Sequence, residues 1–259
     1  MLIALTRGVS PTVADCELQE LEREPIDIAK AIEQHRAYER CLEELGAHVV
    51  SLEADPRFPD GVFVEDPALV LDEIAIMTRP GAESRRGEGE SIAKVLADYR
   101  SLTRIHEPGT LEGGDVMRID RALYVGASRR TNWEGIRQLR EVAAPFGYEV
   151  IAVPVHGCLH LKSACCYLGE ETILANRNWL DAAFLDGYRI LDVPADEPRA
   201  ANALRIGDTL ILPTAFPKTR DLLEKSGFQV RTIENSELAK AEGAVTCTSI
   251  LFQDVTCDT

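Results

Sequence analysis

The repeating unit of this chain is clearest in the stretch Val116-Met-Arg-Ile-Asp-Arg-Ala-Leu-Tyr-Val125. It reads as two short apolar strands joined by a tight turn around Asp120, a residue type that turns favour. A helical pattern follows over residues 134–143, where apolar residues recur at helical spacing. A further apolar strand is expected at 148–153. The pattern therefore predicts a unit of strand, strand, helix and strand (ββαβ).

The same unit recurs along the chain. Hairpins of this form are expected at 68–77, 164–174 and 203–212. A second helical pattern lies at 219–225, and the further strands are expected at 47–52, 99–105, 188–193 and 228–233. Five units of roughly 40–50 residues are what a repeat architecture gives.

The fifth hairpin is divided between the two chain ends. Strand 249–253 would pair with strand 2–6, which predicts a closed ring of five α/β units. An open array with capped ends has the same local pattern. The prediction of a closed ring therefore depends only on the expected pairing of the two terminal strands. No linker rich in Pro, Gly or Ser and no break in composition interrupts the sequence, so residues 1–259 are expected to form a single domain.

Composition and charge disfavour several classes of function. The 259 residues are 45% hydrophobic and 27% charged, which is ordinary for a globular core. The longest apolar runs fall far short of the roughly 20 residues that cross a bilayer, and the N-terminus lacks the basic region of a signal peptide. The net charge of -15 argues against nucleic acid and anionic membranes and favours a small cationic ligand. Many proteins are simply acidic, so charge alone does not decide the matter.

The seven cysteines indicate a reducing compartment. Their number is odd and no C-x-x-C pair occurs, which disfavours a disulfide framework and a structural zinc site. We therefore expect a cytoplasmic protein without a bound metal. In such a protein, an unpaired cysteine near a histidine and a carboxylate is a candidate nucleophile. The cysteines are Cys16, Cys41, Cys158, Cys165, Cys166, Cys247 and Cys257.

Chemically reactive residue types stand just before the expected hairpins. Glu65 and Asp66 precede the first hairpin, and Glu112 precedes the second. His160 precedes the third, and Cys247 precedes the hairpin that is split between the chain ends. The fourth unit has no comparable acid, base or nucleophile. Corresponding strand starts converge at one end of the channel in a ring of repeats, so these residues are expected to meet there.

This set of residues suits covalent attack on a guanidine or an amidine. A nearby imidazolium favours the thiolate that attacks, and paired carboxylates can hold a planar guanidinium. The bound cation also lowers the pKa of the thiol. Taken singly, Cys247 is more often a small core residue and His160 a core histidine, while His106 and His156 are alternative bases. The pair Gly113-Gly114 can serve tight packing alone.

Six short motifs in this order resemble those of the dimethylarginine dimethylaminohydrolases. This family belongs to the guanidino-group modifying superfamily, which includes arginine deiminases and amidinotransferases. The resemblance covers nearly the whole chain and implies a five-bladed, pseudo-fivefold α/β propeller (pentein), in agreement with the repeat. The motifs are Val9-Ser-Pro-Thr12 with Asp15-Cys-Glu-Leu18, Phe63-Val-Glu-Asp66, Leu111-Glu-Gly-Gly-Asp115, Gly126-Ala-Ser-Arg-Arg-Thr-Asn132, His160-Leu-Lys162 and Thr246-Cys-Thr-Ser249.

The resemblance also implies roles for individual residues. Cys247 would be the nucleophile, and His160 the general acid and then the base. Glu112, counted among the catalytic residues, would bind the guanidinium together with Asp66, with Glu65 beside them. Arg129 is the alternative to Arg130 in its motif, and residues 11–24 would form either a lid or an ordinary surface helix. The substrate-binding residues would be Asp66 and Glu65 at the guanidinium, Asp60 with the carbonyls of Leu18 and Ala241 at the α-ammonium, and Arg85 with Arg130 at the α-carboxylate.

The activity implied by the resemblance is hydrolysis of N-omega-methylated arginines. Asymmetric dimethylarginine and monomethylarginine would give citrulline and dimethylamine or methylamine, through a covalent thiouronium on Cys247 and without a cofactor. The alternatives are an arginine deiminase, another guanidine hydrolase or amidinotransferase of the superfamily, and a non-catalytic binding member. A monomer and a homodimer are both compatible with the sequence.

Overall fold

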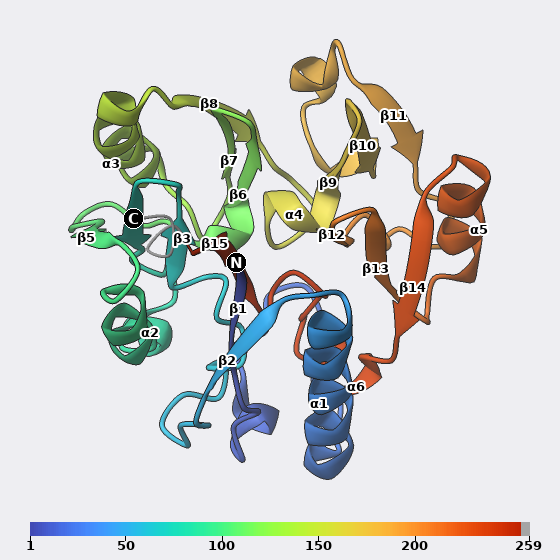
Figure 1. Ribbon diagram of the computed structural model, residues 1–259, viewed down its shortest axis with the longest axis horizontal. Helices are drawn as coiled ribbons and strands as arrows, with labels where there is room; N and C mark the ends of the chain where they lie inside the picture. The colour runs from blue at the N-terminus through green and yellow to red at the C-terminus, as the bar shows by residue number, and fades with distance from the viewer. Residues whose placement is uncertain (255–259) are drawn as a thin grey trace.

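Residues 1–254 are described by the computed structural model, and Cys257 lies outside this range. Five three-stranded sheets surround a common centre, and the longer helices lie toward the outside of the ring (Figure 1). The predicted α/β propeller of five units is therefore confirmed. No helix within the described range is both long and apolar enough to span a membrane.

The strands are β1 Leu2–Arg7, β2 His48–Leu52, β3 Ala68–Val70, β4 Ile74–Met77, β5 Ser101–Arg104, β6 Val116–Ile119, β7 Ala122–Ala127, β8 Glu149–Pro154, β9 Cys165–Gly169, β10 Thr172–Ala175, β11 Arg189–Asp192, β12 Leu204–Ile206, β13 Thr209–Pro213, β14 Gln229–Ile233 and β15 Ile250–Gln253. The α-helices are α1 Ile28–Glu44, α2 Gly89–Leu96, α3 Trp133–Ala143, α4 Leu161–Ala164, α5 Pro217–Lys225 and α6 Ser236–Ala239.

Each sheet combines an antiparallel hairpin with a parallel third strand. In the sheet β6-β7-β8, Val116 pairs with Val125 across the hairpin, and Ala122 pairs with Glu149 on the parallel strand. Helix α3 makes the crossover from β7 to β8, because a tight turn cannot join parallel neighbours. The first strand of each hairpin lies toward the centre of the ring (Figure 1). These strands line a shared cavity of about 310 Å³.

The two ends of the described chain close the ring. Strand β15 pairs antiparallel with β1, and Leu2 lies opposite Gln253. Strand β1 also pairs parallel with β2, which follows the 17-residue helix α1. The hairpin expected between the chain ends is present, and the open-array alternative is wrong.

The third unit departs from the expected pattern. The segment between β10 and β11 forms two 3-10 turns, Arg177–Trp179 and Ala182–Leu185, in place of an α-helix. The side chains of Asn176 and Asp181 each accept a hydrogen bond from the backbone N–H two residues later. Such local hydrogen bonds compete with helix formation, which explains the difference.

Apolar side chains fill the seams between neighbouring units. One cluster joins Leu71 and Ile76 of the first hairpin to Leu123 of β7 and to Ile136 and Leu139 of α3, all of them buried. Burial of a Leu or Ile side chain stabilises the fold by about 1.5–3 kcal/mol. These seams hold adjacent units together and so determine where the innermost strands begin.

Candidate active site

The reactive residues meet where the innermost strands begin. Asp66 precedes β3, His160 stands at the N-terminus of α4 ahead of β9, and Cys247 precedes β15. All three line one small cavity of about 20 Å³. The ring therefore brings together residues that are far apart in the sequence, as the repeat predicts. The other lining residues are Glu17, Asp60, Phe63, Arg85, Arg130, Leu159, Ala241, Glu242 and Gly243.

His160 is held as a cation by the carboxylates around it. Its Nε2 lies 2.7 Å from Glu112 Oε2 and 4.0 Å from Asp66 Oδ1, and its ring is buried. Burial opposes the charge, but Asp66, Asp115 and Glu112 outweigh it and raise the pKa of His160 to about 9. The same imidazolium lowers the pKa of Glu112 although that carboxyl is buried. His160 therefore carries a proton at neutral pH that it can give to a leaving group.

The thiol of Cys247 is protonated when no cation is nearby. Burial and the charges of Glu65 and Asp66 raise its pKa to about 12. The Ala244 N–H lies 3.4 Å from the sulfur, and among residues 1–254 no hydrogen bond joins Sγ to His160. We expected the imidazolium to favour the thiolate, but burial and the two carboxylates dominate. Ionisation of the thiol then depends on a positive charge entering the cavity.

Arg85 lies between two carboxylates. Its Nη1 donates to Asp66 Oδ2 at 2.8 Å, and its Nη2 donates to Glu88 Oε2 at 2.9 Å. All three side chains are buried. Asp66 also accepts a hydrogen bond from the Gly114 N–H at 3.0 Å. Arg85 lines the cavity as expected, but it is also the counter-ion of two buried acids.

Arg130 has weaker protein partners than Arg85. Its Nη1 lies 3.5 Å from Glu112 Oε1, and its Nε donates to Gln19 Oε1 at 3.1 Å. Arg130 is buried and lines the cavity, whereas Arg129 is exposed on the outside. Of the two arginines in this motif, Arg130 is therefore the one that can reach a ligand in the cavity.

The residues expected at the α-ammonium lie close to one another. Asp60 lines the cavity, and its Oδ2 accepts a hydrogen bond from the Glu17 N–H at 3.0 Å. Burial raises the pKa of Asp60. Ala241 lines the cavity as well, and Leu18 packs in the same apolar cluster as Ala241. These positions offer a carboxylate and backbone carbonyls to a cation.

Glu65 does not line the cavity around Cys247. It pairs with Lys162, and its Oε2 accepts a hydrogen bond from Thr246 Oγ1 at 2.9 Å. These three residues line the cavity of about 310 Å³ between the innermost strands. Glu65 therefore acts on the thiol through its charge rather than by contact with a ligand beside Cys247.

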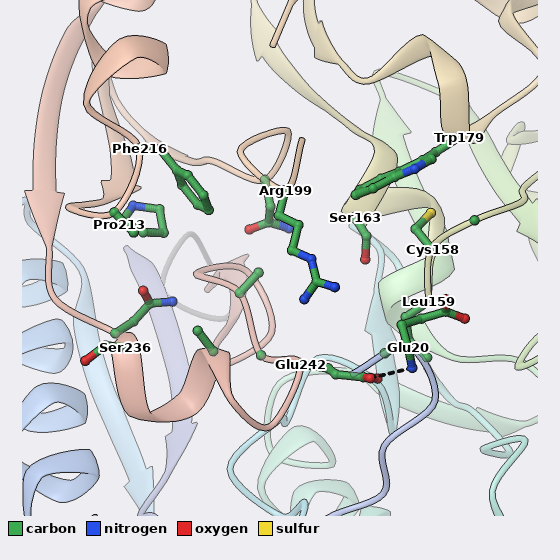
Figure 2. Close-up of a pocket in the computed structure, with 17 residues that line it drawn as sticks. Glu20, Cys158, Leu159, Ser163, Trp179, Arg199, Pro213, Phe216, Ser236 and Glu242 are labelled. Carbon is green, nitrogen blue, oxygen red and sulfur yellow. Dashed lines mark hydrogen bonds between the residues drawn. The ribbon is translucent and has the colours of Figure 1, made fainter. Parts of the chain in front are cut away.

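The alternative bases and thiols lie elsewhere. His106 and His156 are exposed, and neither lines the cavity around Cys247. Cys165 and Cys166 are buried in apolar clusters. Cys158 lines a separate cavity of about 400 Å³ beside the candidate site (Figure 2).

That neighbouring cavity shares a wall with the candidate site. Trp179 and Phe216 form parts of its lining, and the Arg199 side chain projects between them (Figure 2). Leu159 and Glu242 line both cavities. The two cavities are therefore adjacent.

Sequence reasoning missed two buried acids. Asp115 Oδ1 accepts a hydrogen bond from the Leu161 N–H at 2.9 Å, and its Oδ2 accepts one from Ser128 Oγ at 2.6 Å. Asp115 therefore fixes the start of α4, directly after His160, and its place in one of the six motifs was a usable signal. Glu88 lies in an acidic, polar stretch, and nothing in the sequence sets it apart.

One group of side chains could hold a cation. Asp66, Glu112 and His160 each offer a ligand atom, and these atoms lie within 4.8 Å of one another. A metal would have to displace the proton of the imidazolium, because a ligating histidine is neutral. A guanidinium instead donates hydrogen bonds to paired carboxylates and leaves that proton in place. The protonation state of this set therefore suits a guanidinium better than a metal.

Comparisons with known proteins point to one family. A family model described as N,N dimethylarginine dimethylhydrolase, eukaryotic, matches residues 12–197. The N(G),N(G)-dimethylarginine dimethylaminohydrolase of Streptomyces coelicolor is 41% identical over 256 residues, which cover 97% of each chain. The protein of the same name from Pseudomonas aeruginosa is 39% identical over 228 residues, which cover 87% of this chain and 90% of that one.

A solved structure supports the same relationship. DDAH from Pseudomonas aeruginosa, as a mutant complexed with citrulline, matches with a TM-score of 0.92 and 36% sequence identity. The match covers 96% of this chain and 98% of that chain. With the family model and the relatives at about two-fifths identity, this shows that the chain belongs to the dimethylarginine dimethylaminohydrolase family.

Proposed function

We propose that the chain hydrolyses asymmetric dimethylarginine and monomethylarginine to citrulline and dimethylamine or methylamine. The observation that carries this proposal is the cavity in which Cys247, protonated His160 and Asp66 lie beside Arg85 and Arg130. These groups can attack a guanidinium carbon, protonate an amine and bind the charged end of an amino acid. The family relationship supports the same reaction.

The first half of the reaction joins the guanidinium carbon to sulfur. The substrate cation lowers the pKa of the Cys247 thiol from its raised value, and the thiol proton passes to solvent. The thiolate attacks the guanidinium carbon to give a tetrahedral adduct. His160 then gives its proton to the methylated nitrogen, the C–N bond breaks and the amine leaves. A thiouronium remains on the enzyme.

Water completes the reaction. Neutral His160 takes a proton from a water molecule as its oxygen attacks the thiouronium carbon. The C–S bond then breaks, the hydroxyl proton of the adduct passes to the departing sulfur, and citrulline is released, which restores the imidazolium and the thiol. Glu112, 2.7 Å from the ring, stabilises the imidazolium in the first and last states. One water is consumed for each amine released.

The α-ammonium and the α-carboxylate of the substrate are each assigned to protein groups of opposite charge. We propose that Asp60 and the carbonyls of Leu18 and Ala241 hold the α-ammonium. Arg130, with Arg85 behind it, would hold the α-carboxylate through paired hydrogen bonds. This arrangement selects a free amino acid that carries a guanidine on its side chain.

The test is a substrate panel of arginine, monomethylarginine and asymmetric dimethylarginine, with citrulline and amine measured together. We expect both methylated substrates to be turned over faster than arginine. Cys247→Ser should remain folded by circular dichroism and release no citrulline, because its hydroxyl is far less ionised than a thiol. Cys158→Ser is the matched control and should keep its activity. Faster turnover of arginine would make the chain an arginine deiminase instead.

We further propose that this reaction takes place in the cytoplasm. The six cysteines of the described range, Cys16, Cys41, Cys158, Cys165, Cys166 and Cys247, are all free. Free thiols, one of them a nucleophile, suit a reducing compartment. Fractionation of the native source followed by the citrulline assay would test this assignment.

A further inference from the structure

A strap of chain, residues 13–24, borders the candidate active site. It begins with the 3-10 turn Val13–Asp15 and then has no regular secondary structure, so the expected alternative of a surface helix is wrong. The Arg23 guanidinium donates to the Cys16 carbonyl at 2.6 Å and holds the strap in a compact loop. Glu17 of the strap lines the cavity around Cys247.

Residues of the cavity hold the strap at two points. The Glu17 N–H donates to Asp60 Oδ2 at 3.0 Å. Arg130 Nε donates to Gln19 Oε1 at 3.1 Å. Asp60 and Arg130 are the groups proposed to bind the amino-acid end of the substrate. The position of the strap is therefore coupled to the groups that the substrate would contact.

A third anchor is Glu242, a residue that the proposed reaction leaves unused. Its Oε1 accepts hydrogen bonds from three consecutive N–H groups, those of Gln19, Glu20 and Leu21, at 3.0, 2.6 and 2.7 Å. Figure 2 shows the contact with Glu20 at the edge of the neighbouring cavity. Hydrogen bonds to an ionised oxygen are the stronger kind. One carboxylate oxygen therefore fixes the residues that directly follow Leu18.

The backbone of Glu242 is strained, which points to a role for its side chain. Its φ is +61°, in the left-handed region that residues with a Cβ rarely adopt. Strained positions of this kind persist where the surrounding structure or a function requires them. A glycine would adopt this conformation without strain, but it would have no carboxylate to hold the strap.

Substrate entry requires the strap to move. The cavity around Cys247 measures about 20 Å³, which is room for about one water molecule and not for an arginine. The neighbouring cavity of about 400 Å³ is lined by Glu20 and Glu242, so it lies directly beside the contact between them (Figure 2). The strap therefore has open space next to its third anchor.

We propose that Glu242 is a positioning residue, a latch that holds the strap closed and sets the Leu18 carbonyl against the α-ammonium of the substrate. This inference rests on the proposed function, which assigns that contact to Leu18. The latch touches the strap and not the guanidine, so it strengthens substrate binding and takes no part in proton transfer or in attack on the guanidinium carbon.

The kinetic test compares Glu242→Gln and Glu242→Gly with Glu22→Gln, a matched charge change within the strap. Glu22 is exposed and has no hydrogen bond or ion pair with the rest of the described chain. Both Glu242 variants should raise KM for asymmetric dimethylarginine about 10-fold to 100-fold. Their kcat should change by less than about threefold. Glu22→Gln should match the wild type in both constants.

Glu242→Gly distinguishes a role of this residue in holding the strap from a role in the stability of the fold. It removes the carboxylate and also relieves the backbone strain, so its melting temperature should stay close to that of the wild type while KM rises. A large fall in melting temperature in both Glu242 variants, with KM unchanged, would show that the residue serves the fold alone and would overturn the proposal.

A substrate analogue locates the effect at Leu18. The methylated form of 5-guanidinopentanoate lacks the α-ammonium that the Leu18 carbonyl would contact. The ratio of variant to wild-type KM should therefore fall toward one on this analogue. An equal increase in KM on both compounds would overturn the assignment of the latch to the ammonium site.

A last readout needs no turnover. Arg23 is exposed, so trypsin should cleave after it faster in both Glu242 variants than in the wild type or in Glu22→Gln. Equal cleavage rates in all four proteins would contradict the latch. If the wild type turned over neither methylated arginine, the proposed function would fail, and the cleavage comparison would still decide whether Glu242 holds the strap.

Discussion

His160 couples the stability of the fold to pH. A histidine in the unfolded chain titrates near pH 6.5, whereas the acids around folded His160 raise its pKa to about 9 against the effect of burial. Folding therefore favours the protonated ring. Its contribution is fully present below pH 6.5 and is lost as the pH rises through 9. We expect a loss on the order of 3 kcal/mol in the free energy of unfolding across this window, measured by urea titration.

The control for this prediction is His160→Gln, which cannot gain or lose a proton in that range. Its free energy of unfolding should lack the part of the decline that belongs to His160. Parallel curves for the wild type and His160→Gln between about pH 6 and pH 10 would show that the carboxylates do not hold a proton on this ring.

Arg130 should matter for the carboxylate of the substrate and little for the guanidine. Its protein partners are weak, with Glu112 Oε1 at 3.5 Å, so its main partner would be the ligand. Loss of one member of a buried charge pair typically costs about 2–5 kcal/mol. Arg130→Ala should therefore lower kcat/KM for asymmetric dimethylarginine by a factor of roughly 30 to several thousand. The decarboxylated analogue, measured in the same assay, should lose much less.

Arg85→Ala is the informative contrast. It leaves Asp66 and Glu88 buried without their counter-ion, and such unpaired charges strongly destabilise a fold. We expect this variant to lower the melting temperature and to impair both substrates, whereas Arg130→Ala should stay folded. A selective loss of the carboxylate-bearing substrate in Arg85→Ala alone would reverse the two assignments.

At the scale of elements, the turn Gly113–Asp115 connects Glu112 to β6 and packs under His160. A Cβ on Gly114 would lie 2.5 Å from His160 Nδ1 and 2.8 Å from Asp66 Oδ1. Gly114→Ala should therefore displace the imidazole and reduce kcat by about 100-fold, the cost of a misplacement near 1 Å. The measurement is kcat together with the melting temperature, and a wild-type kcat would count against this role of the turn.

Its neighbour should behave differently. A Cβ on Gly113 would lie 2.0 Å from the Glu65 carbonyl oxygen, which is backbone and cannot rotate away. Gly113→Ala should therefore lower the melting temperature more than it lowers kcat. The sequence could explain both glycines by packing alone. In the structure, Gly114 leaves room for the side chain of His160, and Gly113 leaves room for the backbone of the preceding unit.

The hairpins could be predicted because their signals are local. Asp120 and Gly207 stand in turns with φ of 50° and 56°, where a short polar residue or glycine is favoured. The helix of the third unit could not be excluded, because Asn176 and Asp181 disfavour a helix only through the side-chain hydrogen bonds that they form. The spacing of apolar residues and the turn residues predict where strands and helices lie. Side-chain hydrogen bonds to the backbone decide where an expected helix does not form.

Only the site residues that occupy equivalent positions in the repeat could be predicted from the sequence. His160 and Cys247 stand at equivalent positions of different units, so symmetry alone brings them together. Glu88 and Glu242 have no such relation, because their partners are set by loops that the fold places beside them. The protonated state of the Cys247 thiol also required the structure, since it depends on how deeply the sulfur is buried.

At the scale of the whole molecule, the ring is closed by hydrogen bonds rather than by the chain. The Asp254 N–H donates to the Met1 carbonyl at 2.7 Å, and β15 continues this pairing with β1. Cys247 lies three residues before β15, so closure also positions the proposed nucleophile. The other reactive residues precede hairpins whose two strands are continuous in the chain.

This arrangement predicts that the break in the chain can be moved to another unit. A circular permutant would join residue 254 to residue 1 through a short flexible linker and open the chain at the exposed turn Gly207-Asp208. The fourth hairpin would then be split between the ends, as the fifth is in this chain. Exposed turns tolerate such changes, so the permutant should fold and keep kcat within about tenfold of the wild type.

The contrasting variant ends at residue 248 and lacks β15. It removes the partner of β1 and the strand that follows Cys247, so it should lose both cooperative unfolding and citrulline release. Circular dichroism, thermal unfolding and the citrulline assay would be run on both proteins. A permutant with a native spectrum and a paired fourth unit, but without activity, would contradict this prediction. It would show that the site also needs the two strands of the fourth hairpin to be continuous in the chain. Activity in the truncated chain would show that Cys247 does not depend on β15 for its position.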